Sequence, residues 1–226
     1  MPLSYAGKAP RGVHALKRRI SRGTSRRWIV QRFWEEMQPT PEMRAADFGV
    51  SGRRSLAATF FERAYPWKHQ LTAIGRAVEG ADWLAEAFPG LTFLEADLRS
   101  IPLPDDYFDI GICNAVVEHG GTREQQRALV HEVCRVARKV MFTMPNKRFP
   151  IEHHTLLPLV HWLPDHQFRA ILRFLGNDFL ASVENLNLLD ADTLLSLFPP
   201  DRETRLVRGA GWMRFTSVLC VSTARD

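Results

Sequence analysis

Short apolar stretches alternate with helical patterns from residue 43 to residue 146, and this alternation limits the possible fold more than any other feature of the chain. The apolar stretches predict five strands, at residues 43–49, 71–75, 91–96, 108–116 and 139–143. Helices are predicted between them at residues 55–64, 82–88 and 122–137. Strands that alternate with helices form a mostly parallel sheet covered on both faces, so we expect an α/β, Rossmann-like fold.

The C-terminal part of the chain has a different pattern. Residues 203–208 and 214–223 predict two strands joined across Gly209-Ala210-Gly211, which would close the sheet with an antiparallel hairpin. Between the fifth strand and this hairpin, residues 147–198 form a mostly helical insertion. A chain of 226 residues is long enough for one such domain, which we place at residues 42–226.

The first 41 residues are a basic N-terminal tail and helix. Residues 1–32 contain nine Lys or Arg and no acid, whereas the rest of the chain carries 21 basic and 25 acidic side chains. The positive net charge therefore lies in the tail. This excludes a nucleic-acid-binding protein that is basic over its whole length. Apolar residues at helical spacing predict a helix from Thr24 to Met37 that docks on the domain. The tail has three interpretations: a solvated lead-in, a patch that binds RNA or an anionic membrane surface, and a targeting peptide.

The composition is that of an ordinary globular protein. Hydrophobic residues make up 45% of the chain and charged residues 24%, which favours a folded domain over disorder. The sequence contains no run of about 18 apolar residues without charge, so no membrane-spanning helix is predicted. Cys113, Cys134 and Cys220 are too far apart in the sequence for a zinc motif or a disulfide framework. We therefore expect a cytoplasmic protein, with peripheral membrane contact as the alternative, while the oligomeric state stays unknown.

Glycine and polar residues follow several of the predicted strands. Asp47 and Gly49 come at the end of the first strand. Asp97 follows the third strand, and Asn114 ends the fourth. Glycine lets the backbone approach a ligand closely, and carboxylates accept hydrogen bonds from amino and hydroxyl groups. Because parallel sheets bind ligands outside the carboxyl ends of their strands, these residues predict a ligand site at this edge.

These strand ends, in this order, resemble a class I S-adenosylmethionine-dependent methyltransferase. The resemblance covers residues 43–146, and the closing hairpin agrees with it. Its most specific parts are Asp97, the run Ile101-Pro102-Leu103-Pro104-Asp105-Asp106-Tyr107-Phe108-Asp109, and the run Asn114-Ala115-Val116-Val117-Glu118-His119. The resemblance implies a seven-stranded, mostly parallel sheet with an antiparallel last strand, and S-adenosylmethionine as the cofactor.

The resemblance also implies which residues contact the cofactor. In chain order these are Asp47, Gly49, Ser51, Gly52, Ile74, Gly75, Asp97, Leu98, Asn114 and Ala115. Asp47 and Gly49 would lie at the methionine end of the cofactor, and Asp97 would meet the adenine. The sequence departs from the family pattern at two places. Ser51 and Arg53 replace the second and third glycines of the first loop, and no acid ends the second strand to bind the ribose.

A second motif follows the fifth strand. Residues 144–155 read Met-Pro-Asn-Lys-Arg-Phe-Pro-Ile-Glu-His-His-Thr, which resembles a subgroup of bacterial type 11 methyltransferases. In that family this segment helps to shape the pocket of the methyl acceptor. The residues expected on the acceptor side are Glu118, Asn146, Glu152, His153 and Trp162. The apolar residues 156–175 predict a helix that covers the sheet, with an apolar acceptor wall or a membrane contact as alternatives.

The histidines of this region suggest a general base. Methyl transfer to a hydroxyl requires removal of a proton, and imidazole titrates near neutral pH. His119 and His154 are therefore the candidate catalytic residues, with Glu152 to orient a ring. A histidine bound to a loop carbonyl is the structural alternative for each, and positioning alone is another source of rate. We expect no metal site, because His153 and His154 are adjacent and neighbours in sequence seldom chelate one ion together.

The function expected from the resemblance is S-adenosylmethionine-dependent methyl transfer to a small-molecule or lipid-like acceptor, at oxygen. One alternative is an RNA-modifying methyltransferase whose basic tail, residues 1–32, binds phosphate. The other is a protein of this fold that has lost catalysis and serves as a binding or partner subunit. The altered glycine loop and the missing ribose acid motivate this second alternative.

Overall fold

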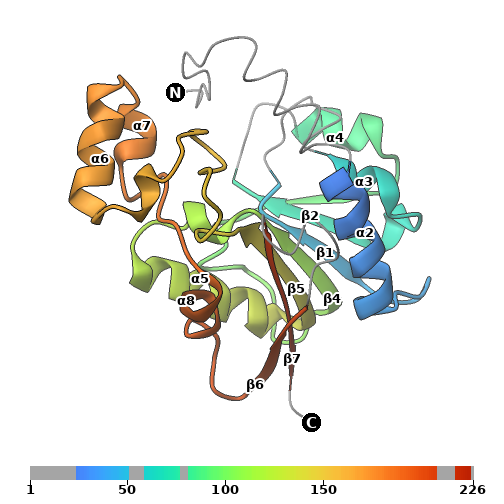
Figure 1. The fold of residues 1–226 in the computed structure, drawn as a ribbon. Helices are drawn as coiled ribbons and strands as arrows, with labels where there is room; N and C mark the ends of the chain where they lie inside the picture. Colours follow the sequence, from blue (N-terminus) through green and yellow to red (C-terminus); the bar gives the residue numbers. More distant parts are fainter. Residues whose placement is uncertain (1–23, 51–58, 77–80, 208–216, 225–226) are drawn as a thin grey trace.

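The computed structural model describes residues 24–50, 59–76, 81–207 and 217–224. Within these residues, seven strands form one sheet in the order β3-β2-β1-β4-β5-β7-β6 (Figure 1). The strands are β1 (Ala45–Phe48), β2 (Leu71–Gly75), β3 (Thr92–Glu95), β4 (Phe108–Asn114), β5 (Ala137–Pro145), β6 (Arg202–Leu206) and β7 (Ser217–Ala224). Strands β1 to β5 are parallel, whereas β7 is antiparallel to both β5 and β6. The predicted Rossmann-like sheet with an antiparallel last strand is confirmed.

The order of the strands reverses on the two sides of β1. The chain moves outward from β1 through β2 to β3, and then returns to form β4 on the other side of β1. Phe48 of β1 consequently pairs with Ile74 of β2 on one side and with Cys113 of β4 on the other. At such a switch point, a ligand crevice forms outside the carboxyl ends of the strands.

Helices cover both faces of the sheet (Figure 1). They are α2 (Thr24–Met37), α3 (Phe60–Ala64), α4 (Ala81–Ala87), α5 (Arg123–Val136), α6 (Asp165–Phe174), α7 (Asp178–Ala181) and α8 (Ala191–Leu195). On one face, Phe33 of α2, Phe61 of α3 and Leu84 of α4 are buried in a common apolar cluster. On the other face, Val133 of α5 and Leu194 of α8 are buried in a second cluster. The predicted N-terminal helix and its docking on the domain are confirmed.

Helix α5 begins at a capping box, as its sequence predicts. The backbone N–H of Thr122 donates to Oε1 of Gln125 over 2.9 Å, and the Gln125 N–H donates to Oγ1 of Thr122 over 3.4 Å. This reciprocal pair satisfies two N–H groups that have no partner within the helix. Leu129 and Val133, four residues apart, then bury one face of α5 against the sheet.

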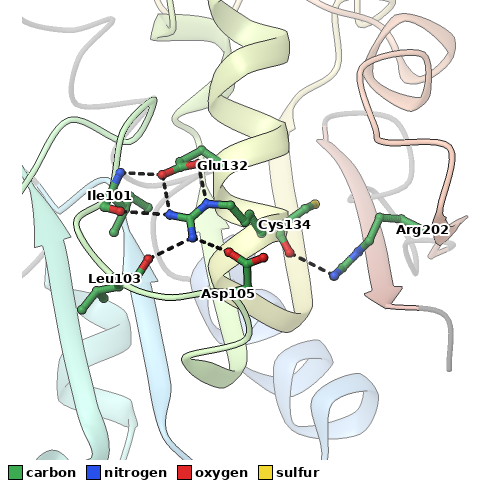
Figure 2. Close-up of polar contacts among 7 residues, drawn as sticks. Ile101, Leu103, Asp105, Glu132, Cys134 and Arg202 are labelled. Atoms are coloured by element: carbon green, nitrogen blue, oxygen red, sulfur yellow. Dashed lines mark hydrogen bonds and ion pairs between the residues drawn. The ribbon is translucent and has the colours of Figure 1, made fainter.

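The other end of α5 has no capping residue of its own. The helix ends at Val136 and β5 begins at the next residue, Ala137, so the chain enters the sheet without a loop. Arg202 of β6, which is buried, supplies the missing donors. Its guanidinium donates to the carbonyl oxygens of Cys134, Ala137 and Arg138, and Figure 2 shows the first of these bonds. Carbonyl groups at the C-terminal end of α5 are thereby satisfied by a distant strand.

Residues 156–175 of the insertion do not cover the sheet, which corrects the prediction of a cover helix there. Only residues 165–174 of that range form an α-helix, α6. Phe168 and Leu172 of α6 pack with Leu180 of α7 in a cluster separate from the two that line the sheet. Figure 1 shows the α6–α7 pair beside the sheet and away from its faces. The helical spacing identifies the buried residues of α6, but α5 and α8 already occupy the sheet face on that side.

The C-terminal hairpin forms as predicted. Strands β6 and β7 pair antiparallel, with Leu206 opposite Cys220. The predicted connection across Gly209-Ala210-Gly211 lies outside the described residues. Within the described ranges, no helix combines the length and the apolar character needed to cross a membrane.

Candidate active site

Two glycines allow the loops at the switch point to touch. Gly49 follows β1 with a φ of 94°, and a Cβ there would lie 2.3 Å from Cγ2 of Val116, just after β4. Gly75 ends β2, and a Cβ there would lie 2.2 Å from the carbonyl oxygen of Val50. A larger residue at either place would displace the neighbouring chain, so glycine is required where these strand ends meet.

Two buried carboxylates lie near each other at β1. The side chain of Asp47 in β1 is 8% exposed, and Glu62 of α3 is fully buried. Burial first, and then the charge of Glu62, raise the pKa of Asp47 well above its usual value. Burial also raises the pKa of Glu62 to about 7. The carboxylate oxygens of Glu62 have no hydrogen-bond partner among the described residues.

Glu62 was not among the sequence candidates. It lies in the short helix Phe60–Ala64 between Phe61 and Arg63, where a glutamate resembles an ordinary surface residue. The apolar residues around it in the sequence, Phe60 and Phe61, were the available signal that this turn packs inward.

Asp97, just after β3, is held by two arginines. Arg99 donates from Nε to Oδ1 over 3.0 Å and from a terminal nitrogen to Oδ2 over 2.6 Å. Arg76, the residue after β2, donates to the same Oδ2 over 2.8 Å. The hydrogen bonds from Arg99, and then those from Arg76, hold the pKa of Asp97 far below its usual range although burial opposes this. Arg76, where the family pattern has a ribose-binding acid, therefore orients the carboxylate of the next strand.

Arg135 fixes the loop after Asp97 to α5. Figure 2 shows Ile101, Leu103 and Asp105 of this loop near Glu132 of the helix. The guanidinium of Arg135 donates to the carbonyl oxygens of Ile101 and Leu103 over 3.0 and 2.9 Å. It also forms ion pairs with Asp105 and Glu132 at 2.6 and 2.8 Å. The run Ile101 to Asp109, prominent in the sequence, thus contains at least one acid whose contact is structural.

The end of β4 turns sharply toward the loop after β5. Oδ1 of Asn114 accepts a hydrogen bond of 2.5 Å from Oγ1 of Thr143. Ala115 has a left-handed φ of 54°, and its N–H donates to the carbonyl oxygen of Thr143 over 2.8 Å. The chain then forms a short 3-10 helix of one turn, Val117–His119, which carries two of the predicted site residues.

Four of the predicted residues come together in one cluster, which we call the Glu–His cluster: Glu118, His119, Glu152 and His154. Nδ1 of His154 lies 2.8 Å from Oε1 of Glu152, and its Nε2 lies 3.9 Å from Oε1 of Glu118. The rings of His119 and His154 meet edge to face, with centroids 4.9 Å apart. Nδ1 of His119 lies 2.6 Å from the carbonyl oxygen of Asn185. The side chains of Glu118 and Glu152 are 2% and 1% exposed, so the cluster is largely dry.

The loop after β5 wraps around the carboxylate of Glu152. The backbone N–H groups of His154 and Thr155 donate to its two oxygens, over 2.9 and 2.5 Å. Burial opposes ionisation of Glu152, but the hydrogen bonds from His154 and Thr155 and the charge of His154 lower its pKa to about 2. Glu152 is therefore ionised and acts only as an acceptor, which orients the ring of His154.

The remaining predicted residues lie outside the Glu–His cluster. His153 is exposed, with its ring centroid 6.0 Å from that of His154. Trp162 is 53% exposed, and its Nε1 donates to the carbonyl oxygen of Lys147. Oδ1 of Asn146 accepts from the Arg148 N–H in a local turn. Of the expected cofactor residues, Ile74 and Leu98 have side chains buried in the core, and Ser51 and Gly52 lie outside the described residues.

A cavity of about 220 Å³ lies beside the Glu–His cluster. Its lining includes the basic side chains of Arg123, Lys147 and Arg169. The cavity is linked to the cluster by Asn187, which lines it and whose N–H donates to the carbonyl oxygen of Glu118 over 2.8 Å. His161, which the sequence reading did not single out, is buried there and bonds the carbonyl oxygens of Lys147 and Phe149.

Comparisons with known proteins agree with this geometry. A family model described as "Methyltransferase domain" matches residues 48–140. No curated protein matches the sequence. Among solved structures, the PH0226 protein of Pyrococcus horikoshii is similar with a TM-score of 0.62 at 13% identity, over 89% of this chain and 90% of that chain.

Two further solved structures are methyltransferases by name. The N-methyltransferase NodS of Bradyrhizobium japonicum, in complex with S-adenosylhomocysteine, has a TM-score of 0.57 at 12% identity, over 98% of this chain and 95% of that chain. A SAM-dependent methyltransferase of Aquifex aeolicus has a TM-score of 0.52 at 13% identity, over 94% of this chain and 98% of that chain. These similarities concern the fold.

The residues that match the family model form the part of the sheet that surrounds the switch point. The matched residues begin at the last residue of β1 and end within β5, so they include the carboxyl ends of β1 to β4 and stop before the loop that carries Glu152 and His154. Residues 48–140 therefore match a methyltransferase domain, and the described chain has the Rossmann-like fold of the solved methyltransferases compared above.

Proposed function

We propose that the protein transfers the methyl group of S-adenosylmethionine to a hydroxyl oxygen of a small-molecule or lipid-like acceptor. One observation carries the proposal beyond the cofactor, namely the buried pair of His154 and Glu152 in the Glu–His cluster. A neutral hydroxyl is a weak nucleophile, so a base must take its proton as the oxygen attacks the methyl group, whereas an uncharged amine attacks without prior loss of a proton. A preoriented base therefore favours oxygen as the acceptor atom.

The pair determines which nitrogen of His154 can take a proton. Because Glu152 is ionised and accepts only, a neutral His154 carries its hydrogen on Nδ1 and directs it to Oε1 of Glu152, 2.8 Å away. Nε2 then has the lone pair. This nitrogen lies 3.9 Å from Oε1 of Glu118, which follows β4. His154 would act as the base and Glu152 as a positioning residue.

The residues at the switch point fit the cofactor in charge and in shape. Bound there, S-adenosylmethionine supplies an electrophilic methyl group on a sulfonium cation. Asp47 and Glu62 form a desolvated acidic pair, and nearby positive charge such as the amino group of the methionine end stabilises the ionised form of such carboxylates. Gly49 and Gly75 let the chain segments after β1, β2 and β4 approach one another closely at this edge. Asp97, held ionised by its two arginines, retains acceptor capacity for the adenine.

The surroundings of the cluster support an acceptor that is partly apolar. The insertion next to it exposes Trp162, Leu163, Phe174 and Leu175, at 53%, 42%, 89% and 55%. Exposed apolar side chains on one segment are a feature of surfaces that contact lipid or apolar ligands. The basic lining of the neighbouring cavity, with Lys147, would suit an anionic group on the same acceptor.

The experiment is a transfer assay with methyl-labelled S-adenosylmethionine and three acceptor classes: phenols, hydroxylated lipids and primary amines. We expect label on hydroxyl acceptors. We expect the His154→Ala variant to lose about 10²–10⁴-fold in turnover, because a general base contributes that much. The Glu152→Gln variant should also lose turnover while binding S-adenosylhomocysteine as before. His166→Ala, which changes an exposed histidine of α6, is the matched control. Label on amines alone, or equal turnover in His154→Ala and His166→Ala, would refute the proposal.

A further inference from the structure

The Glu–His cluster contains three groups that can bind one metal ion. Glu118 and His119 come from the 3-10 turn after β4, and His154 comes from the loop after β5. Each offers one ligand atom, and the three atoms lie within 4.8 Å of one another. His153 and His154 are adjacent in the sequence, and two such neighbours seldom chelate one ion together. The structure leaves His153 exposed. Glu118 and His119 are neighbours in sequence too, but the 3-10 turn places a ligand atom of each within 4.8 Å of the other and of His154.

Glu118 lacks the partners that a buried carboxylate needs. Its side chain is 2% exposed, and neither oxygen has a hydrogen-bond partner among the described residues. A buried charge without partners is strongly unfavourable, so such groups are normally paired or bound to a metal. The ring of His154 lies near the carboxylate of Glu118. Its Nε2 is 3.9 Å from Oε1 of Glu118, which is beyond hydrogen-bond distance.

Both histidine rings are held in the manner of metal ligands. Nδ1 of His154 faces Oε1 of Glu152 at 2.8 Å, and Nδ1 of His119 faces the carbonyl oxygen of Asn185 at 2.6 Å. A metal-binding histidine almost always donates its other ring N–H to a carboxylate or a backbone carbonyl. With Nδ1 as the donor in each ring, Nε2 is the nitrogen with the lone pair.

We propose that Glu118, His119 and His154 form a binding site for a divalent transition-metal ion. Two imidazoles and one carboxylate suit Zn²⁺, Co²⁺ and Fe²⁺, whereas Mg²⁺ and Ca²⁺ prefer sites built from oxygen. Ligand atoms about 2.0–2.2 Å from a tetrahedral ion lie roughly 3.4 Å apart. The separations here, 3.9 Å for His154 to Glu118 and up to 4.8 Å in the cluster, require side-chain shifts of about 1 Å.

An ion of tetrahedral coordination that is held by these three side chains has one coordination position left for a further ligand. In terms of the proposed function, on which this step rests, that ligand is the acceptor hydroxyl. An ion lowers the pKa of a bound hydroxyl, whose proton then passes to water. His154 would then hold the metal instead of acting as a base, and Glu152 would still position its ring.

The test measures metal binding directly, without cofactor or acceptor. Untagged full-length protein is stripped with a chelator and titrated with ZnCl₂ by calorimetry, with MgCl₂ as the comparison. We expect one Zn²⁺ per chain and no binding of Mg²⁺ under the same conditions. With CoCl₂ we expect visible absorption bands of a low-coordinate cobalt site.

Variants assign the site. His119→Ala, His154→Ala and Glu118→Gln should each abolish the single Zn²⁺ site and the cobalt bands, and Glu152→Gln should weaken Zn²⁺ binding by about 10–100-fold. His166→Ala and His153→Ala, which alter exposed histidines, should bind as the parent protein does. Thermal melting shows whether each variant is folded, and His119→Ala gives a second, independent reading if Glu118→Gln is not.

The outcomes separate this proposal from the proposed function. Zn²⁺ binding that persists in both His119→Ala and His154→Ala, or that is absent from the parent protein, would overturn the metal site. If the stripped protein methylates hydroxyl acceptors at full rate and binds no metal, His154 is a base and the metal proposal fails alone. If the metal binds and no hydroxyl is methylated, the metal site stands and the proposed function fails.

Discussion

The buried carboxylate of Glu62 should make the protein less stable as the pH rises from about 4.5 to about 7. In the folded chain the pKa of Glu62 is raised to about 7 from its ordinary value of 4.5, and burial is the main cause. Between these two values the folded protein keeps a proton that the unfolded chain has released. The folded state then binds more protons, so the free energy of unfolding falls as pH rises.

The size of the effect follows from the shift. Each pKa unit corresponds to about 1.36 kcal/mol, so Glu62 contributes a loss of about 3 kcal/mol by pH 7. Glutamine has nearly the same shape and no charge. The Glu62→Gln variant should therefore match the parent near pH 4.5 and exceed its stability by up to about 3 kcal/mol at pH 8. At about 2–4 °C per kcal/mol, this raises the melting temperature by roughly 6–12 °C.

The assay is thermal melting from pH 4.5 to pH 8 by circular dichroism. Glu42→Gln, which alters an exposed glutamate, is the matched control and should follow the parent curve. Asp47 also has a raised pKa, so the curve of Glu62→Gln should be flatter than that of the parent without being level. Parallel curves for the parent and Glu62→Gln across this pH range would refute the assignment of the shift to Glu62.

Three further predictions concern other parts of the chain. Asp97→Ala should weaken binding of S-adenosylhomocysteine by about 1–3 kcal/mol, the usual effect of leaving a hydrogen-bonding group of the bound ligand without its partner, and unchanged affinity by calorimetry would remove Asp97 from the cofactor site. Arg135→Ala should lower the free energy of unfolding by about 1–3 kcal/mol in urea, because the loop that begins at Ile101 loses its bonds to α5, whereas Arg138→Ala, at an exposed position, should not. If residues 1–32 bind RNA, the RNA affinity of the parent protein should fall steeply as the salt concentration rises, and deletion of these residues should abolish binding. RNA binding by the parent that does not depend on salt would contradict that role.

Local sequence signals predicted the sheet well because they depend on neighbours in the chain. The second strand, Leu71–Gly75, has the bounds that its apolar run predicts, and the capping box of Thr122 and Gln125 forms as its spacing requires. The first and third strands are shorter than predicted, β1 by three residues and β3 by two. Apolar residues beyond a strand end do not by themselves extend the ladder of hydrogen bonds.

Features that depend on packing between distant segments could not be predicted. The sequence pattern predicted the apolar face of α6. It did not predict that this face packs against α7. The burial of Glu62 depends in the same way on contacts between α3 and the sheet. The sequence places His154 beside His153, whereas only the fold shows that Glu118 and His119 approach His154 from another strand end.

The guanidinium of Arg202 links the end of α5 to a strand that is made much later in the chain. While the protein is being synthesised, α5 and β5 leave the ribosome before Arg202 does, so the carbonyl groups at their junction bond to water until β6 arrives. We therefore expect the junction of α5 and β5 to become protected from hydrogen exchange at the same time as the C-terminal hairpin, and not with the first half of the sheet. Synthesis of the last strands would thus complete the hydrogen bonds of the junction between α5 and β5 as well as the edge of the sheet.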